Sequence, residues 1–225
     1  MNGDEDRFDD PRVRAARTKR DRTRRALLDA ADAAFGSRGW SRTRIEDIAT
    51  AAGVSAATAY NHFPSKHTLI GHAFEPLARP LVLRAEQDLA GGRPVVDALT
   101  DQLRDLARLT VRHAGLTVSF WCAVQDYTIR KEGRADPADV IDPRTLAPLP
   151  DAVRILVEHG QALGDLRRYP PADVLSRALV NVLLTRAVTE PGESAEERAQ
   201  LLVTLLLGAL RPELLVDRPG GAPVA

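Results

Sequence analysis

The sequence has 225 residues, in which 31 Lys and Arg balance 31 Asp and Glu, and it holds a single cysteine, Cys122. This length suits one or two domains, the zero formal charge excludes a whole-molecule field that attracts nucleic acid, and the lone cysteine excludes an intramolecular disulfide. No uncharged apolar run reaches the roughly 18 residues that span a bilayer, and the acidic start MNGDEDRFDD is unlike a signal peptide, so we expect a cytoplasmic protein with no membrane partner.

Charge is distributed unevenly along the chain. Residues 11–44 contain 11 Lys and Arg against 3 Asp, a local charge of +8 (11 minus 3). We expect residues 1–17 to form a flexible charged arm, disordered at its start. Its basic residues either reach DNA phosphates or a minor groove, or form a solvated tail that adds only nonspecific attraction: Arg12, Arg14, Arg17, Lys19 and Arg20.

The spacing of apolar residues predicts a first long helix over residues 18–38. Its core stripe runs from Leu27 to Phe35, and Gly39 ends it. Trp40 is expected to pack beneath the turn that follows.

A short second helix is predicted over residues 44–52. Thr43 and Glu46 have the spacing of a capping box, and Ile45, Ile48 and Ala49 repeat at helical intervals. Gly53 follows, and glycine accepts the left-handed backbone that ends a helix abruptly.

A third helix is predicted over residues 56–62. Ser55 is placed to cap its start, Phe63-Pro64 ends it, and Ser65 caps the next helix. Two short helices joined by a glycine turn indicate a helix-turn-helix, whose second helix can lie in the DNA major groove. An ordinary pair of core helices is the alternative, but the small Ala49, placed where the helices must touch, favours DNA binding.

The run I-x-D-I-A-x-A-A-G-V-S-x-x-T-x-Y-N-H-F-P-S-K-x-x-L, starting at Ile45, resembles the N-terminal domain of the TetR family of bacterial transcription regulators. The resemblance covers about residues 22–70, and the rest resembles the family only in length and helical character. Ala59 departs from it, because the family more often has a larger apolar residue there. The resemblance implies a dimeric regulator, usually a repressor, that binds a palindromic DNA operator and is controlled by a small-molecule effector.

The expected architecture is therefore all-α, with a three-helix helix-turn-helix DNA-binding domain and a C-terminal helical ligand-binding and dimerisation domain. We place the first domain at residues 18–70, the second at 71–215 and a flexible tail at 216–225.

Ten residues match the family's DNA-facing positions. Asn61 is the best reader of a base edge, because an amide can pair bidentately with adenine, whereas Lys66 suits a phosphate. Thr58 and Tyr60 can bond phosphates through their hydroxyl groups, and the alanines can touch thymine methyl groups. The full set is Thr43, Arg44, Ser55, Ala56, Ala57, Thr58, Tyr60, Asn61, His62 and Lys66.

Two helices are predicted over residues 66–89 and 94–113, the first bent near Pro76 and Pro80, the second ended by Gly115. A further helix, residues 116–130, carries the main aromatic and polar cluster outside the DNA-binding end. It is either a ligand site or ordinary core packing: Phe120, Trp121, Gln125 and Tyr127.

Residues 131–150 carry four prolines and predict a loop, either a lid or a plain linker. Helices follow over residues 151–163, 172–189 and 194–210, the last opened by a capping box at Ser194 and Glu197. The helices at 172–189 and 194–210 are apolar around much of their circumference, which predicts a homodimer through a four-helix interface or, alternatively, a large core.

We expect no catalytic residue, metal or cofactor. His67 and His72 lie five apart rather than the three or four that stack on one helix face for a metal, and no nucleophile motif or phosphate loop is present. Two further interpretations stay open: a protein-interaction module that has lost its operator, which the alanine-rich recognition helix allows, and a helical enzyme.

Overall fold

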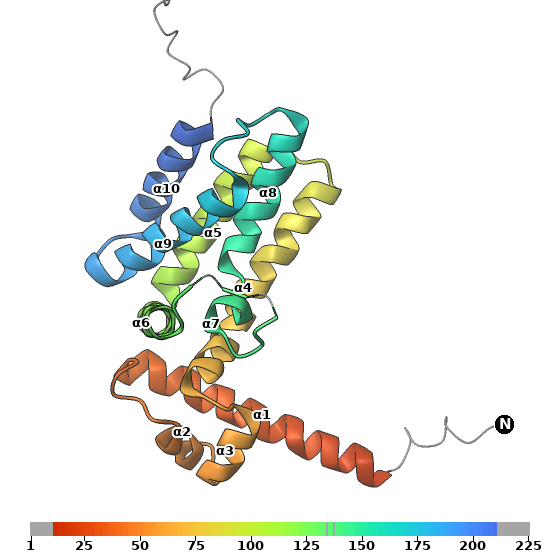
Figure 1. Ribbon diagram of the computed structural model, residues 1–225, viewed down its shortest axis with the longest axis vertical. Coiled ribbons are helices and arrows are strands. Elements are labelled where there is room, and N and C mark those ends of the chain that lie inside the picture. Colours follow the sequence, from red (N-terminus) through yellow and green to blue (C-terminus); the bar gives the residue numbers. More distant parts are fainter. Residues whose placement is uncertain (1–10, 134, 137, 211–225) are drawn as a thin grey trace, which may run out of the picture. The chain divides into compact units, whose positions relative to one another are not determined.

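The computed structural model describes residues 11–133, 135, 136 and 138–210, and in this part every regular element is a helix (Figure 1). The all-α prediction is therefore confirmed. The helices form two compact units, one of residues 11–75 and 115–147, the other of residues 76–114 and 148–210. The predicted tail at 216–225 lies outside the described residues.

Unit 1 contains the predicted helix-turn-helix. It is built around large buried side chains such as Leu27, Phe35, Ile48 and Phe63, and Phe74 stacks on Phe120 with ring centroids 4.4 Å apart. Its elements are α1 (Pro11–Arg38), α2 (Ile45–Ala51), α3 (Ala56–His62), the first turns of α4 (Lys66–Ala90), α6 (Ala114–Lys131) and α7 (Pro143–Leu146).

Helix α1 begins seven residues earlier than predicted. The prediction of a flexible arm is wrong for residues 12–17, which are helical, while residues 1–10 lie outside the described part. Two physical reasons account for the longer helix. Proline is favoured at a first helical position, and the Ala and Arg residues that follow are strong helix formers with no glycine among them.

Gly115 does not end a helix, as its position had suggested. Helix α5 ends at Arg112 and α6 begins at Ala114, so Gly115 lies in the first turn of α6. A Cβ atom at Gly115 would lie 2.0 Å from the carbonyl oxygen of Gly36. The Ser119 hydroxyl donates to the Phe35 carbonyl at 2.8 Å one turn later. Glycine is thus required because α6 crosses the end of α1 at backbone contact.

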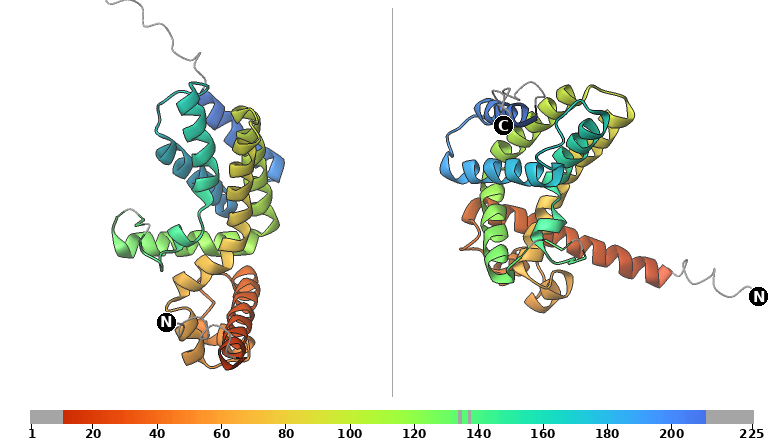
Figure 2. Two further views of the ribbon diagram at one scale, coloured as in Figure 1. Left: turned by 90° about the vertical axis from the view of Figure 1, so that its right-hand side faces the viewer. Right: turned by 45° about the horizontal axis from the view of Figure 1, so that its top comes forward.

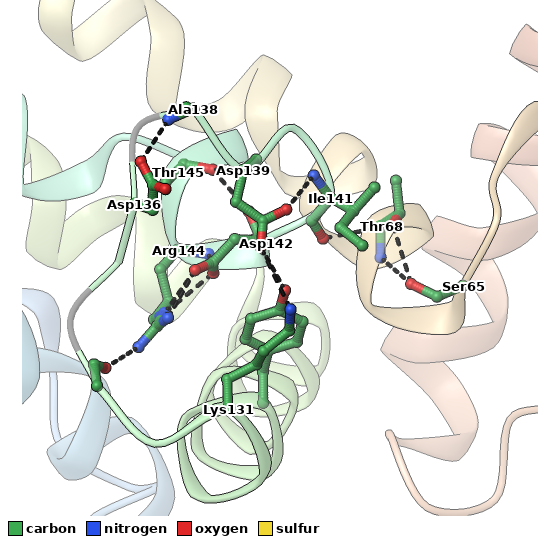
Figure 3. Close-up of polar contacts among 12 residues, drawn as sticks. Ser65, Thr68, Lys131, Asp136, Ala138, Asp139, Ile141, Asp142, Arg144 and Thr145 are labelled. Carbon is green, nitrogen blue, oxygen red and sulfur yellow. Dashed lines mark hydrogen bonds and ion pairs between the residues drawn. The ribbon is translucent and has the colours of Figure 1, made fainter.

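Aspartate turns, and no regular element, occur among the described residues between α6 and α7 (Figure 3). Asp136, Asp139 and Asp142 each accept the backbone N–H two residues ahead, at 2.8 to 3.1 Å. The Asp142 carboxylate is 1% exposed and pairs with the Arg144 guanidinium at 2.6 Å, while the Thr68 hydroxyl of α4 donates to the Ile141 carbonyl. The predicted loop is therefore shorter, because α7 occupies part of it and α8 starts at Leu149.

Unit 2 packs around α5, which contacts α8, α9 and α10 (Figure 2). Buried leucines such as Leu99, Leu103 and Leu106 form its core. Its elements are residues 76–90 of α4, α5 (Val95–Arg112), α8 (Leu149–Leu163), α9 (Ala172–Thr189) and α10 (Ala195–Leu210).

Several predicted boundaries of unit 2 are confirmed. Helix α9 has the predicted ends, and α10 opens with the predicted capping box, in which Ser194 N–H donates to Glu197 Oε2 and Glu197 N–H donates to Ser194 Oγ. Helix α4 continues through Pro76 and Pro80. The division into units differs from the predicted domains 18–70 and 71–215, because residues 115–147 belong with the helix-turn-helix.

Gly115→Ala is expected to lower the free energy of unfolding by about 2 kcal/mol or more, because the new methyl group meets backbone that cannot move aside. Gly36→Ala is the matched control. No atom lies within 4 Å of the Cβ position at Gly36, so this helical substitution should be neutral or stabilise by about 0.5–1 kcal/mol. Urea unfolding of both variants measures the difference, and equal effects would contradict the close approach.

Candidate nucleic-acid interface

The turn between α2 and α3 has the left-handed glycine and the serine cap that the sequence predicted. Gly53 has a φ of +71°, in the left-handed region, and the Val54 N–H donates to the Ala49 carbonyl at 2.9 Å. Ser55 caps α3, because its hydroxyl oxygen accepts the Thr58 N–H at 3.1 Å. Ala49 and Ala59 are buried, so small residues stand where the two helices touch.

The predicted capping box at Thr43 is not formed. Helix α2 starts at Ile45 without a side-chain cap. The Thr43 hydroxyl instead points back to α1, within hydrogen-bond distance of the Ala34 and Gly39 carbonyls at 3.2 and 2.8 Å. The Thr43 side chain is 1% exposed, so the prediction that it faces DNA is wrong. It packs inside the fold and fixes the turn between α1 and α2.

Lys66 is likewise engaged within the protein. Its ammonium group donates to the carbonyls of Trp40 at 2.6 Å and Thr43 at 3.0 Å and lies 3.9 Å from the centroid of the Trp40 ring. Burial lowers the pKa of Lys66. The sequence suggested a phosphate contact for Lys66, whereas in the structure its ammonium group ties the start of α4 to the segment before α2.

The outer face of α3 carries the remaining predicted residues. Ala57, Tyr60 and Asn61 are exposed, Ala56, Thr58 and His62 are half-buried, and Ala59 faces inward. The Asn61 amide has no hydrogen-bond partner among the described residues, whereas the hydroxyls of Ser55 and Thr58 share a hydrogen bond of 2.9 Å. Asn61 is therefore the polar group of α3 that is placed to bind an external partner.

Tyr60 and Arg44 meet at a carboxylate that the sequence did not single out. The Tyr60 hydroxyl donates to Glu46 Oε1 at 2.9 Å, and the Arg44 guanidinium lies 4.0 Å from the same carboxylate with its side chain 79% exposed. Hydrogen bonds from the Glu46 backbone and from Tyr60 lower the pKa of Glu46. Glu46 is thus ionised at neutral pH and holds the Tyr60 hydroxyl away from other acceptors.

Two arginines of α1 lie near the end of α3. The Arg24 guanidinium lies 4.5 Å from the centroid of the Phe63 ring. Burial, with Arg20 and Arg24 nearby, lowers the pKa of His62. His62 is therefore neutral at pH 7, and cationic side chains of α1 supply the charge at this end of the recognition helix.

A cluster around His67 joins the start of α4 to α6 within unit 1. His67 Nε2 is hydrogen-bonded to Asp126 Oδ2 at 2.8 Å, and its ring lies 4.9 Å from that of Trp40 and 5.3 Å from that of Tyr127. Burial lowers the pKa of His67 more strongly than Asp126 raises it. Burial raises the pKa of Asp126, but the hydrogen bonds and charges of Arg130 and His67 together outweigh it, so the pKa of Asp126 is lowered.

The four residues predicted to bind a ligand do not converge. Phe120 and Tyr127 are buried, and the Tyr127 hydroxyl donates to Asp139 Oδ2 at 2.9 Å. Burial, together with this bond, raises the pKa of Tyr127 to about 12. Trp121 is half-buried and Gln125 is exposed. The alternative of ordinary core packing therefore describes Phe120 and Tyr127.

Unit 2 holds a groove that sequence reasoning missed. It has a volume of about 580 Å³ and lies between α4 and α5. Apolar residues with two prolines form one wall, and Arg108, Arg112 and His113 bring basic groups to the other; the lining is Pro76, Leu77, Pro80, Asp105, Arg108, Leu109, Arg112 and His113. Asp105 already pairs with Arg84 and Arg108, while Arg112 has no partner among the described residues.

The described residues offer neither a metal site nor a membrane-spanning helix. No group of three or more His, Cys, Asp or Glu residues in that part is arranged to hold a metal ion. None of the helices described for this chain has the length and apolar character that crossing a membrane requires.

Comparison with known proteins gives one family. Residues 27–73 match the sequence profile of "Bacterial regulatory proteins, tetR family". The transcriptional regulator CymR of Pseudomonas putida is 32% identical over 97 residues, 43% of this chain and 48% of that protein. The transcriptional repressor KstR2 of Rhodococcus jostii is 33% identical over 79 residues, 34% of this chain and 39% of that protein. The matches therefore span less than half the length of either curated relative.

A solved structure extends the similarity to nearly the whole chain. FadR of Thermus thermophilus, a TetR-family transcriptional repressor in complex with lauroyl-CoA, superposes with a TM-score of 0.65 and 26% identity. The alignment covers 90% of this chain and 100% of that one.

The His67 cluster predicts a pH-dependent stability. A histidine with a lowered folded-state pKa takes up its proton more readily when unfolded, so stability present above about pH 6.5 is lost as the pH falls below it. The thermal midpoint should fall more for the wild type than for His67→Gln between about pH 7.5 and about pH 5.5. Glutamine keeps a donor for Asp126 but does not titrate, so identical pH profiles would contradict this account.

Proposed function

Because the chain belongs to the tetR family of bacterial regulatory proteins, we propose that it is a transcriptional repressor that binds a palindromic DNA operator as a homodimer and responds to a small molecule. The observation that carries this proposal is the outer face of α3. It presents the unpartnered Asn61 amide beside small side chains, with the basic groups of α1 at its end. That face has the size and chemistry to enter a major groove.

The residues of this face have different parts in the proposal. Asn61 reads a base edge, most favourably adenine through its amide. Ala56 and Ala57 admit the DNA backbone closely or touch thymine methyl groups. Arg44, whose side chain is 79% exposed, is free to swing from Glu46 to a phosphate or a guanine. Ser55 and Thr58 act chiefly by capping α3.

Tyr60 contributes a phosphate contact only if its hydroxyl leaves Glu46. The Glu46 carboxylate therefore opposes nonspecific binding, since it keeps a negative charge beside the proposed phosphate path. Lys66 acts indirectly, through the position of α2 and α4.

The proposed dimer uses α9 and α10. Both helices keep large apolar side chains exposed, namely Val174 at 48%, Val188 at 42% and Leu205 at 44%. Two such helices from each protomer can bury these side chains in a four-helix bundle. A dimer also supplies two copies of α3, which a palindromic operator requires. Sedimentation of the purified chain at the mass of a monomer would remove this part of the proposal.

The groove between α4 and α5 is the proposed effector site. Its apolar wall suits a hydrocarbon chain, and Arg108 and Arg112 suit an anionic head group at the rim. FadR of Thermus thermophilus binds lauroyl-CoA, a ligand of that chemistry. We therefore propose an amphipathic anion as the effector. Binding that favours one of two dimer arrangements would change the spacing of the α3 helices.

Relatives that regulate transcription support a role without catalysis over the alternative of a helical enzyme. A protein-interaction module would use the same face of α3 but would not distinguish DNA sequences. Operator binding decides between these alternatives.

Asn61→Ala should reduce the preference for operator over scrambled DNA by about 10-fold, since one bidentate amide–base pair is lost. The probe is the intergenic DNA beside the protein's own gene, titrated against a scrambled duplex. Gln125→Ala, which removes an exposed amide from α6, is the control and should keep the preference. If Asn61→Ala keeps the wild-type ratio of operator affinity to scrambled-DNA affinity, Asn61 does not read a base. If the wild-type protein binds both duplexes equally, the proposed repressor function is wrong.

Lauroyl-CoA should raise the thermal midpoint of the wild-type protein in a concentration-dependent way, because a ligand that binds the folded state stabilises it. Arg112→Gln should weaken this effect by about 10-fold in apparent affinity, as a charged hydrogen bond is lost. Arg104→Gln, on α5 and paired with Asp101, is the control outside the groove. Equal shifts in both variants would show that the head group binds elsewhere.

A further inference from the structure

The α4 wall of the groove in unit 2 contains a backbone acceptor as well as apolar rings. Pro76 and Pro80 both line the groove and stand about one turn apart inside α4. In an α-helix each carbonyl oxygen accepts the N–H of the residue four positions ahead, but proline has no N–H. The Pro76 carbonyl therefore lacks its regular intrahelical donor. It points along the helix toward Pro80, so it lies on the groove side of α4.

A second acceptor without a donor lies close to this groove. The side-chain amide of Gln102, on α5, donates through Nε2 to the Leu81 carbonyl at 3.1 Å, next to Pro80. The Gln102 Oε1 atom is buried and has no hydrogen-bond partner among the described residues. Gln102 stands about one turn before Asp105, which lines the groove. Acceptors that lack a donor therefore stand at two places between α4 and α5.

The opposite wall of the groove supplies donors. Arg108 and Arg112 of α5 line it and are exposed. The groove thus offers cations on one wall and a neutral acceptor, the Pro76 carbonyl, on the other. A plain hydrocarbon chain placed over this carbonyl would remove its water without replacing the hydrogen bond, which is unfavourable. A ligand that satisfies both walls has an anionic group and a hydrogen-bond donor close together.

We propose that the Pro76 carbonyl is a subsite for a hydroxyl group of the effector, so that the groove selects hydroxylated amphipathic anions over unsubstituted ones. The anionic group pairs with Arg112, and the hydroxyl, a few atoms away on the ligand, donates to the carbonyl. This assignment rests on the proposed effector site. It adds to the ligand a donor that neither a hydrocarbon chain nor an anionic head group requires.

The test measures a ratio of two affinities for each protein. Isothermal titration gives the dissociation constants of decanoate and 3-hydroxydecanoate, which differ only in one hydroxyl group near the carboxylate. The wild type should bind 3-hydroxydecanoate about 10-fold more tightly, because decanoate leaves the covered carbonyl unsatisfied. No DNA is present, so the result does not depend on operator binding.

Two proline variants form a matched pair, because each removes a ring from the groove and adds a helical N–H. In Pro80→Ala the new N–H donates to the Pro76 carbonyl, so the ratio should fall to about 1, chiefly through tighter binding of decanoate. In Pro76→Ala the new N–H donates to the carbonyl of His72, which is not among the residues that line the groove. The absolute affinities can change in both variants, but Pro76→Ala should keep a ratio of about 10.

Arg112→Gln separates the anion contact from the hydroxyl subsite. It should weaken both acids to a similar extent and leave their ratio unchanged, since both carry the same carboxylate. Equal affinities of the wild type for the two acids would overturn the subsite and leave the effector groove in place. If neither acid binds the wild type, the proposed effector chemistry fails and the subsite fails with it.

The remaining outcomes also decide the proposal. A ratio that survives Pro80→Ala but is lost in Gln102→Leu would assign the hydroxyl to Gln102 and overturn the role of the Pro76 carbonyl. Loss of the ratio in both proline variants would show that the shape of the groove, and not the carbonyl, selects the ligand. Loss in Pro80→Ala alone is the result that supports the subsite.

Discussion

The Lys66 ammonium group is the point on which the geometry of the helix-turn-helix depends. It donates to two carbonyls of the segment between α1 and α2 and covers the Trp40 ring. The Thr43 hydroxyl binds the end of α1 from the same segment. The end of α1, the start of α2 and the start of α4 are thus fixed at one place, and α3, which follows α2 in the chain, packs on α2. Removing the ammonium group would leave the part-buried Thr43 carbonyl without this donor, whereas the Trp40 carbonyl would keep the Thr43 N–H at 3.4 Å; an unsatisfied buried group costs about 1–3 kcal/mol. The outer face of α3 is consequently a fixed surface.

Local sequence signals predicted most helix boundaries, because caps, prolines and glycines act on neighbouring residues. Helices α3 and α9 have the predicted ends for this reason. The same four-residue pattern nevertheless gave a capping box at Ser194 and not at Thr43, because Thr43 is drawn into the core by acceptors four and nine residues away. Gly115 looked like a helix end, but its partner Gly36 lies far along the chain. The spacing of apolar residues along the chain could not predict features that depend on a partner far away in the sequence.

In the candidate site, too, local features could be predicted from the sequence and features that depend on distant partners could not. The exposed positions of α3 could be predicted, since they follow from helical spacing and from a family motif. The roles of Lys66 and Tyr60 could not, because their partners Trp40 and Glu46 lie 26 and 14 residues away. Aromatic content indicated α6 as the ligand helix, yet Phe120 is engaged with Phe74 in the core. The groove in unit 2 is formed by two separate stretches of chain, 76–80 and 105–113, neither of which is distinctive alone.

The central claim is that two copies of α3, held by this fold, read one palindromic site. Hydroxyl-radical footprinting on the intergenic DNA beside the protein's own gene, with scrambled competitor at physiological salt, tests it most directly. The account predicts two protected segments related by two-fold symmetry and centred about one helical turn, or a multiple of it, apart. Protection that disappears with competitor or with modest salt would mean that only nonspecific attraction between basic side chains and the DNA backbone is at work, and it would contradict the claim.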